Sequence, residues 1–164
     1  MQGLRRQGRA YALQLLYQID ISGQRDETVQ ELFWKESKAS PRARAFGEEL
    51  VQGTLKAQER IDALLSEALE NWKMSRLPVI VRNVLRLAAC ELLVIGSEPH
   101  PVVINEALEL LREYMDEESA KFANGVLDKI RQTGGEPGQK AAEAPGEPTG
   151  SENRAADTPS EENG

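Results

Sequence analysis

Apolar side chains recur at helical spacing along most of this chain. Over residues 4–19 they follow the i, i+4, i+7, i+8 and i+11 pattern of a single helical face. These positions are Leu4, Gly8, Tyr11, Ala12, Leu15, Leu16 and Ile19. Similar periodicity returns several times up to Ile130, and no stretch of four or more residues alternates cleanly enough to predict a strand. The pattern therefore predicts an all-α fold, a compact helical bundle of about seven helices.

Capping and breaking residues predict where these helices begin and end. Ser, Thr, Asp and Asn are preferred at the position directly before a helix, Pro is tolerated in the first turn, and Gly is frequent directly after the last turn. The expected boundaries are the turn Ser22-Gly23-Gln24, the capping box Thr28-x-x-Glu31, the Ser40-Pro41 start, Pro78 and Gly96 around the most apolar helix, the Pro99-His100-Pro101 opening, and a cap at Ser119. The fourth apolar pattern ends at Trp72.

The most apolar stretch runs from Leu77 to Ile95, where 14 of 19 residues are apolar. Four polar residues interrupt it, namely Arg82, Asn83, Arg86 and Glu91. These interruptions favour a buried core helix over a membrane span. Because the helix is apolar around most of its circumference, we expect the other helices to surround it. The N-terminus lacks the apolar region of a secretory signal peptide.

Composition changes sharply after Gln132. Residues 133–164 contain six Gly, four Pro and no apolar side chain larger than Ala, which predicts a disordered tail. Seven acids against Lys140 and Arg154 give this tail a net charge of −5, so the body, residues 1–132, carries only −2 of the total of −7. The chain thus divides into a helical domain, residues 1–132, and an acidic tail, residues 133–164. The low pI reflects the tail.

The first 19 residues are the most basic segment of the body. They contain Arg5, Arg6 and Arg9 and no acid before Asp20. At about 100° per residue these arginines lie on the flank and far side of the apolar stripe, and Tyr17 lies on roughly the bearing of Arg6. Arginines with an aromatic ring on an exposed helical face are suited to phosphate contacts and base stacking on single-stranded RNA. The alternative is an ordinary solvated basic face.

A second candidate segment lies near the end of the body. Phe122 borders the apolar stripe of its helix, with Lys121 and Lys129 nearby. An aromatic ring at such an edge can stack on a base, although the series Phe122, Val126, Ile130 also fits a position in the core. Gly125 inside this helix is unfavourable by about 1 kcal/mol relative to Ala, which indicates a close approach of another helix.

Enzyme hypotheses find little support. The chain has no GxxxxGK[ST] loop and no GxGxxG after a strand, so it lacks the standard phosphate cradles, and we expect no cofactor. A single Cys and a single His exclude a disulfide framework and the two-His metal sites, and they indicate an intracellular protein. We interpret Cys90 as a small core residue and His100 as a solvated loop residue. No catalytic constellation is found.

Three segments together resemble one known family. They are residues 84–92 (VLRLAACEL), 103–110 (VINEALEL) and 121–129 (KFANGVLDK), with Pro99 between the first two. The start Arg5-Arg6-x-x-Arg9 and the pair Leu16-Tyr17 match the first helix of the same family. This family is the bacterial transcription antitermination factors called NusB, and the resemblance covers residues 4–131.

The resemblance implies a fold and a function. NusB proteins are all-helical and resemble two packed three-helix bundles. They bind the boxA element of nascent RNA with a ribosomal protein that doubles as the factor NusE, and so help RNA polymerase read through terminators, notably in ribosomal RNA operons. By position, the RNA-binding residues fall on Arg5, Arg6, Arg9, Tyr17, Lys121 and Phe122, and the NusE contacts on Val81 and Glu118. A cytoplasmic protein without membrane contact is implied.

The match departs from the family pattern at several positions. Gln7 and Gly8 stand where other family members have more basic or small residues, so the segment contains fewer cations than in those members. Val81 stands where an acid can occur, and Cys90 replaces what is often an aromatic residue. One rival function is the accessory domain of a ribosomal RNA cytosine methyltransferase, although a tail rather than a methyltransferase domain follows here. Another is a purely protein-binding helical adaptor. Self-association into a homodimer that covers the RNA surface is a further possibility, and the acidic tail is hypothesised to compete with RNA for the arginines.

Overall fold

The computed structural model describes residues 3–134 of the chain, and the acidic tail predicted for residues 133–164 lies almost entirely outside this range. Within it, seven α-helices and two short helical segments follow one another without a strand, which confirms the all-α prediction. The elements are α1 (Leu4–Ser22), α2 (Glu27–Glu36), α3 (Pro41–Lys56), α4 (Gln58–Leu69), the 3-10 turn η1 (Met74–Arg76), α5 (Val79–Cys90), the π-helical segment η2 (Glu91–Ile95), α6 (His100–Tyr114) and α7 (Glu117–Gly134).

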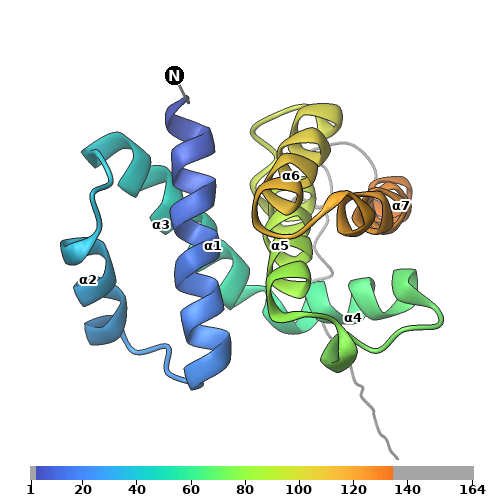
Figure 1. The fold of residues 1–164 in the computed structure, drawn as a ribbon, viewed down its shortest axis with the longest axis horizontal. Coiled ribbons are helices and arrows are strands. Elements are labelled where there is room, and N and C mark those ends of the chain that lie inside the picture. Colours follow the sequence, from blue (N-terminus) through green and yellow to red (C-terminus); the bar gives the residue numbers. More distant parts are fainter. Residues whose placement is uncertain (1–2, 135–164) are drawn as a thin grey trace, which may run out of the picture.

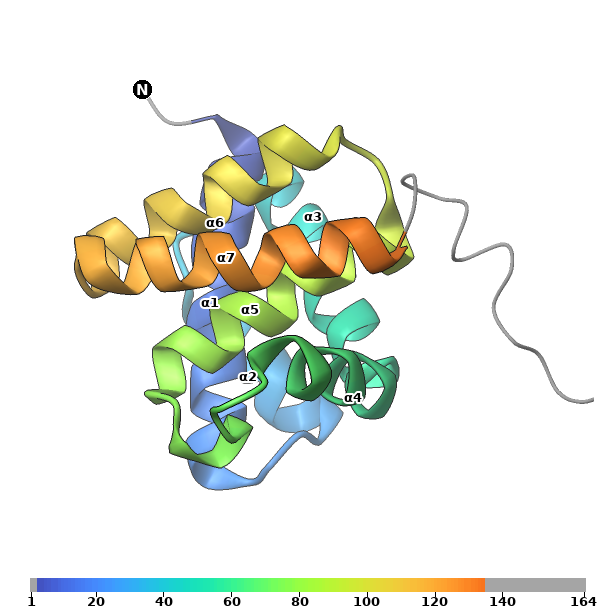
Figure 2. The same ribbon diagram turned by 90° about the vertical axis from the view of Figure 1, so that its right-hand side faces the viewer.

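The helices form two groups. Helices α1, α2 and α3 lie on one side, and α4, α6 and α7 surround α5 on the other (Figure 1). Seen from the second side, α6 and α7 run antiparallel to each other across α5 (Figure 2). The central position expected for the most apolar helix is therefore confirmed, and every residue of α5 from Asn83 to Cys90 is buried.

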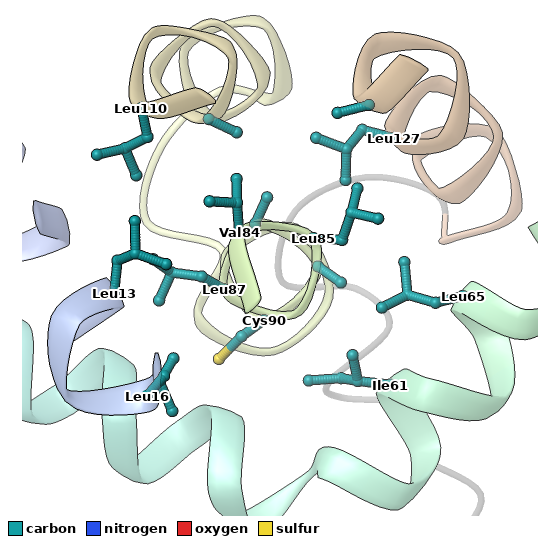
Figure 3. Packing of buried hydrophobic residues seen from close by; sticks show 14 of the residues in the cluster. Leu13, Leu16, Ile61, Leu65, Val84, Leu85, Leu87, Cys90, Leu110 and Leu127 are labelled. Carbon is teal, nitrogen blue, oxygen red and sulfur yellow. The ribbon is translucent and has the colours of Figure 1, made fainter. Parts of the chain in front are cut away.

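The core is built around α5 because each neighbouring helix directs apolar side chains at it. Leu16 from α1, Ile61 and Leu65 from α4, Leu110 from α6 and Leu127 from α7 converge on this helix (Figure 3). All five are at most 5% exposed. Burying a leucine or isoleucine side chain contributes about 1.5–3 kcal/mol, so this cluster supplies much of the stability. Helices α1 and α3 bring their surfaces to it from the first group.

Two glycines let α1 and α3 pack unusually closely. A Cβ on Gly8 of α1 would lie 2.9 Å from the carbonyl oxygen of Ala43 in α3, and one on Gly47 of α3, which is next to the carbonyl oxygen of Gly8, would lie 2.6 Å from the Trp34 ring of α2. Both distances are shorter than real Cβ contacts. The glycine at the fifth position of α1 therefore serves packing, in agreement with its place on the apolar stripe.

A partly buried polar network ties the two groups together. Asp20 of α1 accepts two hydrogen bonds from the Arg82 guanidinium, at 2.8 and 2.9 Å, and one from the Asn83 amide at 2.8 Å. Arg86 reaches the same carboxylate at 3.1 Å and forms a two-bond pair with Asp62 of α4 at 2.8 and 3.0 Å. The polar interruptions of the most apolar helix thus connect it to α1 and α4.

Several local predictions are corrected by the structure. The capping box at Thr28 is wrong, because α2 begins at Glu27 after Asp26, whereas Ser40 does cap α3 by accepting a hydrogen bond from Ala43 at 3.2 Å. The cap of α7 is Asp116, which accepts a hydrogen bond from the Ser119 amide at 2.7 Å. His100 is a buried first residue of α6, 9% exposed, and not a solvated loop residue.

Gly125 was expected to mark a close helix approach, but a Cβ at this position would meet no atom within 4 Å. The residue is exposed on the outer surface of α7. The packing explanation for this glycine is therefore wrong, because no other helix among residues 3–134 approaches the place that a side chain would take.

Candidate nucleic-acid interface

Arg5 and Arg6 lie at the N-terminal end of α1 with partly exposed guanidinium groups. The Arg5 side chain is 47% exposed, lies 4.7 Å from the centre of the Phe46 ring, donates to the Ser97 hydroxyl at 3.1 Å and lies 3.5 Å from Glu98. Arg6 is 43% exposed and donates two hydrogen bonds to the Glu106 carboxylate, at 3.0 and 2.8 Å. Both groups can be reached from solvent, as a phosphate contact requires.

Arg9 is placed differently from its two neighbours. Its side chain is 4% exposed and donates to both oxygens of Glu91, at 2.7 and 2.8 Å. It also pairs with Glu98 and lies 3.7 Å from Glu106. The expectation that Arg9 belongs to an exposed basic face is therefore wrong. The reason is tertiary, because η2 and α6 cover this part of α1 with acids that are distant in the sequence.

The π-helical segment η2 explains how Glu91 reaches Arg9. The segment follows α5 directly and ends at Gly96, which has a left-handed backbone (φ 60°) and donates to the carbonyl of Glu91 at 2.9 Å. Such wide turns are rare and often occur at functional sites. Here the turn carries a buried carboxylate that faces the N-terminal helix.

The three arginines of α1 are thus balanced by three carboxylates, Glu91, Glu98 and Glu106. Burial alone would lower the pKa of Arg9, but its hydrogen bonds to Glu91 and Glu98 outweigh that effect and raise it. The hydrogen bond from Arg6 lowers the pKa of Glu106, which keeps this carboxylate ionised at neutral pH. The local charge at this end of α1 is much closer to neutral than the +3 of the sequence segment.

Tyr17 lies two turns further along α1 and is 41% exposed. Within residues 3–134 its ring stacks on no other ring and its hydroxyl forms no hydrogen bond. Leu13, one turn earlier, is buried in the core. The helix therefore leaves an aromatic surface free to stack on a planar ligand.

Phe122 lies at a groove on the second group of helices. Its ring packs partly against the core and meets the indole of Trp72 edge-on, with ring centres 6.3 Å apart and an interplanar angle of 79°. The groove has a volume of about 340 Å³. Its lining comes from the α4–α5 connection, the start of α5 and the start of α7, and comprises Trp72, Arg76, Leu77, Pro78, Val81, Asp116, Glu118, Ser119 and Phe122.

This groove brings together residues that the resemblance assigned to two different ligands. Val81 and Glu118, the expected NusE contacts, line it beside Phe122, an expected RNA contact. Val81 is only 2% exposed, whereas Glu118 and the neighbouring Lys121 are exposed. Lys129 is engaged elsewhere, donating to Glu70 at 2.6 Å. The structure thus brings Phe122 together with Val81 and Glu118, whereas among residues 3–134 Phe122 makes no ring or ion contact with the arginines of α1 or with Tyr17.

Two groups of residues were missed by sequence reasoning. The carboxylates that pair with the arginines lie more than 80 positions away, and no local pattern marks them as partners. The apolar pattern places Trp72 at the end of the fourth helix, but the residue follows the end of α4 and is 57% exposed. Its polar neighbours Asn71 and Lys73 were the available signal that this ring leaves the core.

Other chemistry receives no support in the part of the chain that the structure describes. No group of three or more His, Cys, Asp or Glu side chains could hold a metal ion among residues 3–134. Cys90 is fully buried, which raises the pKa of its thiol to about 12 and keeps it protonated. No helix in this range is long and apolar enough to cross a membrane.

Comparison with known proteins gives a consistent result. The family model described as "NusB family" matches residues 6–132. A transcription antitermination protein NusB from Koribacter versatilis is 40% identical over 129 residues, covering 78% of this chain and 88% of that protein. The NusB protein from Lysinibacillus sphaericus is 45% identical over 126 residues, covering 77% and 95% of the two chains.

Solved structures show the same similarity. The NusB structure from T. maritima superimposes with a TM-score of 0.73 at 32% identity, covering 87% of this chain and 99% of the other. A crystal structure of the antitermination factors NusB and NusE in complex with dsRNA gives a TM-score of 0.69 at 29% identity, with coverage of 81% and 99%.

Proposed function

This chain belongs to the NusB family of transcription antitermination proteins, and we propose that it binds the boxA element of nascent ribosomal RNA transcripts together with a ribosomal protein acting as NusE. In this role it would join the RNA polymerase antitermination complex in the bacterial cytoplasm and allow read-through of terminators. The similarity to a NusB that is complexed with NusE and RNA supports this assignment.

The observation that carries the RNA part of the proposal is the exposed pair Arg5 and Arg6. Their guanidinium groups are held in fixed positions by Glu98 and Glu106 and remain almost half exposed. An arginine donates in a planar fork that matches phosphate geometry, so each can exchange its carboxylate partner for an RNA phosphate. Lys121 provides a further exposed cation, and Tyr17 and Phe122 provide rings for base stacking.

Arg9 takes a different role in this proposal. Because its side chain is buried and satisfied by carboxylates, it acts as a positioning residue that fixes the N-terminal half of α1 against η2 and α6. Val81 and Glu118 form the proposed NusE-facing part of the surface. Val81 is 2% exposed and supports the groove wall from beneath, so Glu118, with its exposed negative charge, is the part of this surface that NusE can reach directly.

RNA titration with variants of Arg5 and Arg6 tests the function. We expect the protein with NusE to bind boxA RNA more tightly than a scrambled RNA of the same composition. The double variant R5A/R6A should bind more weakly and show a salt dependence reduced by about 1.4 in log–log slope, since each phosphate contact on a single strand contributes about 0.7. R44A is the matched control, because Arg44 is a similarly exposed arginine paired with Glu48 on α3.

Equal affinity for boxA and scrambled RNA would contradict sequence-specific recognition.

A second candidate, a helical adaptor that binds only proteins, is favoured by one observation, namely that all three arginines already have carboxylate partners. In that case R5E/R6E would leave antitermination unchanged in a terminator read-through assay. Under the RNA hypothesis the same charge reversal abolishes read-through. Light scattering of the free protein and of its RNA complex would show whether a homodimer competes with RNA.

A further inference from the structure

Trp72 is the largest apolar side chain that remains at the surface of residues 3–134. It lies in the connection between α4 and α5, and 57% of its surface is exposed. Trp34, the only other tryptophan, is 4% exposed and packs between Tyr11 and Phe33. Tryptophan at a surface is characteristic of interfaces, because its large flat ring gives much contact area with little loss of entropy.

The groove beside Trp72 is shaped for a small planar group. Phe122 meets the indole edge-on at 6.3 Å, and Leu77 and Pro78 add apolar walls. A volume of about 340 Å³ is at the lower end of the range for ligand pockets. An edge-to-face pair leaves ring surface uncovered, so a third aromatic system can stack against it.

The charges around the groove decide which part of a nucleic acid would enter it. Glu118 and Asp116 line the rim, and a phosphate between them would be repelled. A nucleobase is uncharged, and its amino groups can donate to carboxylate oxygens. Arg76 also lines the rim and has no carboxylate partner among residues 3–134, so it is free to contact the phosphate outside.

We propose that this groove holds one unstacked base of a single-stranded RNA, with the Trp72 indole as the platform and Arg76 on the adjoining phosphate. The inference rests on the proposed function, because it extends the RNA path from Lys121 and Phe122 across the α4–α5 connection. Bases with an exocyclic amine are favoured over uracil, since their amine can donate to Glu118, whereas the only base donor of uracil, N3–H, lies between two carbonyl oxygens that a carboxylate repels. Because the proposed NusE contacts Val81 and Glu118 line the same groove, a basic segment of NusE is the competing occupant, and it is an outcome of the test.

The test measures affinity and fluorescence on the same full-length protein with NusE and boxA RNA. W72A should weaken RNA binding by about 5- to 150-fold, the range for the loss of one aromatic–base stack. W72F, which keeps a ring, should recover much of this loss. L32A is the matched control, because Leu32 is 55% exposed on α2 in the other group of helices. RNA should quench the emission of the wild type, whose buried Trp34 contributes an unchanging background, and the RNA-induced change should vanish in W72F.

An RNA series with one abasic nucleotide at each position provides a readout that leaves the protein unaltered. An abasic nucleotide at one position should abolish the quenching and weaken RNA binding as much as W72A does. When that RNA is tested with the W72A variant, the loss of affinity should be no larger than with either change alone. If W72A weakens NusE binding but leaves the affinity for RNA unchanged, the groove holds a protein segment and the proposal is overturned. If neither is affected, the groove is no binding site. Failure of the proposed function is distinct, because then R5A/R6A would also leave RNA binding unchanged.

Discussion

Arg9 and Glu91 form a two-bond ion pair, at 2.7 and 2.8 Å, between the first helix and the π-helical segment that follows α5. Only 4% and 3% of their side chains are exposed. The pair joins residues 82 positions apart, one in the basic N-terminal helix and the other in the most apolar segment of the chain. It holds α1 so that the preceding arginines reach the surface at the start of α6.

The first prediction concerns this pair. R9A should lower the free energy of unfolding by about 3–5 kcal/mol, because it leaves the Glu91 carboxylate buried without its main partner. Urea unfolding at neutral pH measures the change. The double replacement R9M/E91M should recover most of the loss, since it removes both charges and keeps apolar volume. R44A, which breaks an exposed pair on α3, should cost at most about 0.5 kcal/mol. A small effect of R9A would show that Glu91 relaxes to solvent.

The second prediction concerns the contact between Arg6 and Glu106. E106Q removes one negative charge and weakens the two-bond pair, so the Arg6 guanidinium becomes more available to phosphate. We expect RNA affinity at low salt to rise by about 1.5- to 5-fold, the scale of a surface ion pair. E48Q on α3 is the matched control, because it removes the same charge from another Arg–Glu pair. A fall in affinity would instead mean that Glu106 holds Arg6 in its binding position.

The third prediction is a pH dependence that originates at Asp20. Hydrogen bonds from Arg82, reinforced by Asn83 and Arg86, lower the pKa of Asp20 from 3.8 to about 2. Because the pKa is lower in the folded state, the ionised carboxylate stabilises the fold. This stabilisation is fully present above the pKa of the unfolded state and is lost as the pH falls through the pKa of the folded state. The difference in unfolding free energy between wild type and D20N should therefore shrink between pH 4 and pH 2. Urea unfolding across this range measures it, and a constant difference would contradict the assignment.

The fourth prediction compares two glycines that sit inside helices. G125A should stabilise the protein by about 0.5–1 kcal/mol, because alanine is the better helix former and the added Cβ meets no atom within 4 Å. G47A should destabilise it, because the same Cβ would lie 2.6 Å from the Trp34 ring. Thermal unfolding of both variants measures the opposite signs. Destabilisation by G125A without loss of helix would reveal a contact at α7 that residues 3–134 do not show.

Periodicity was sufficient to predict the helices of this protein. The apolar stripe of α1 predicts a helix that is buried on one face, and the nearly continuous apolar run of α5 predicts a helix that is buried all round. Because exposed apolar surface is unfavourable, α5 is the element that the other helices must surround. Helix ends were less predictable. Ser40 caps α3 as expected, but the caps of α2 and α7 fall on Asp26 and Asp116, since several polar residues near each end compete for the same role.

The residue types of the candidate interface were also visible in the sequence, through the arginines of α1 and the segment around Phe122. What only the tertiary structure decided is the state of those residues. It buries Arg9, gives Arg6 a carboxylate partner 100 positions away and sets the exposed Trp72 against Phe122. The physical reason is that helical spacing is a local property of the backbone, whereas burial and ion pairing depend on which distant segment covers each helix face.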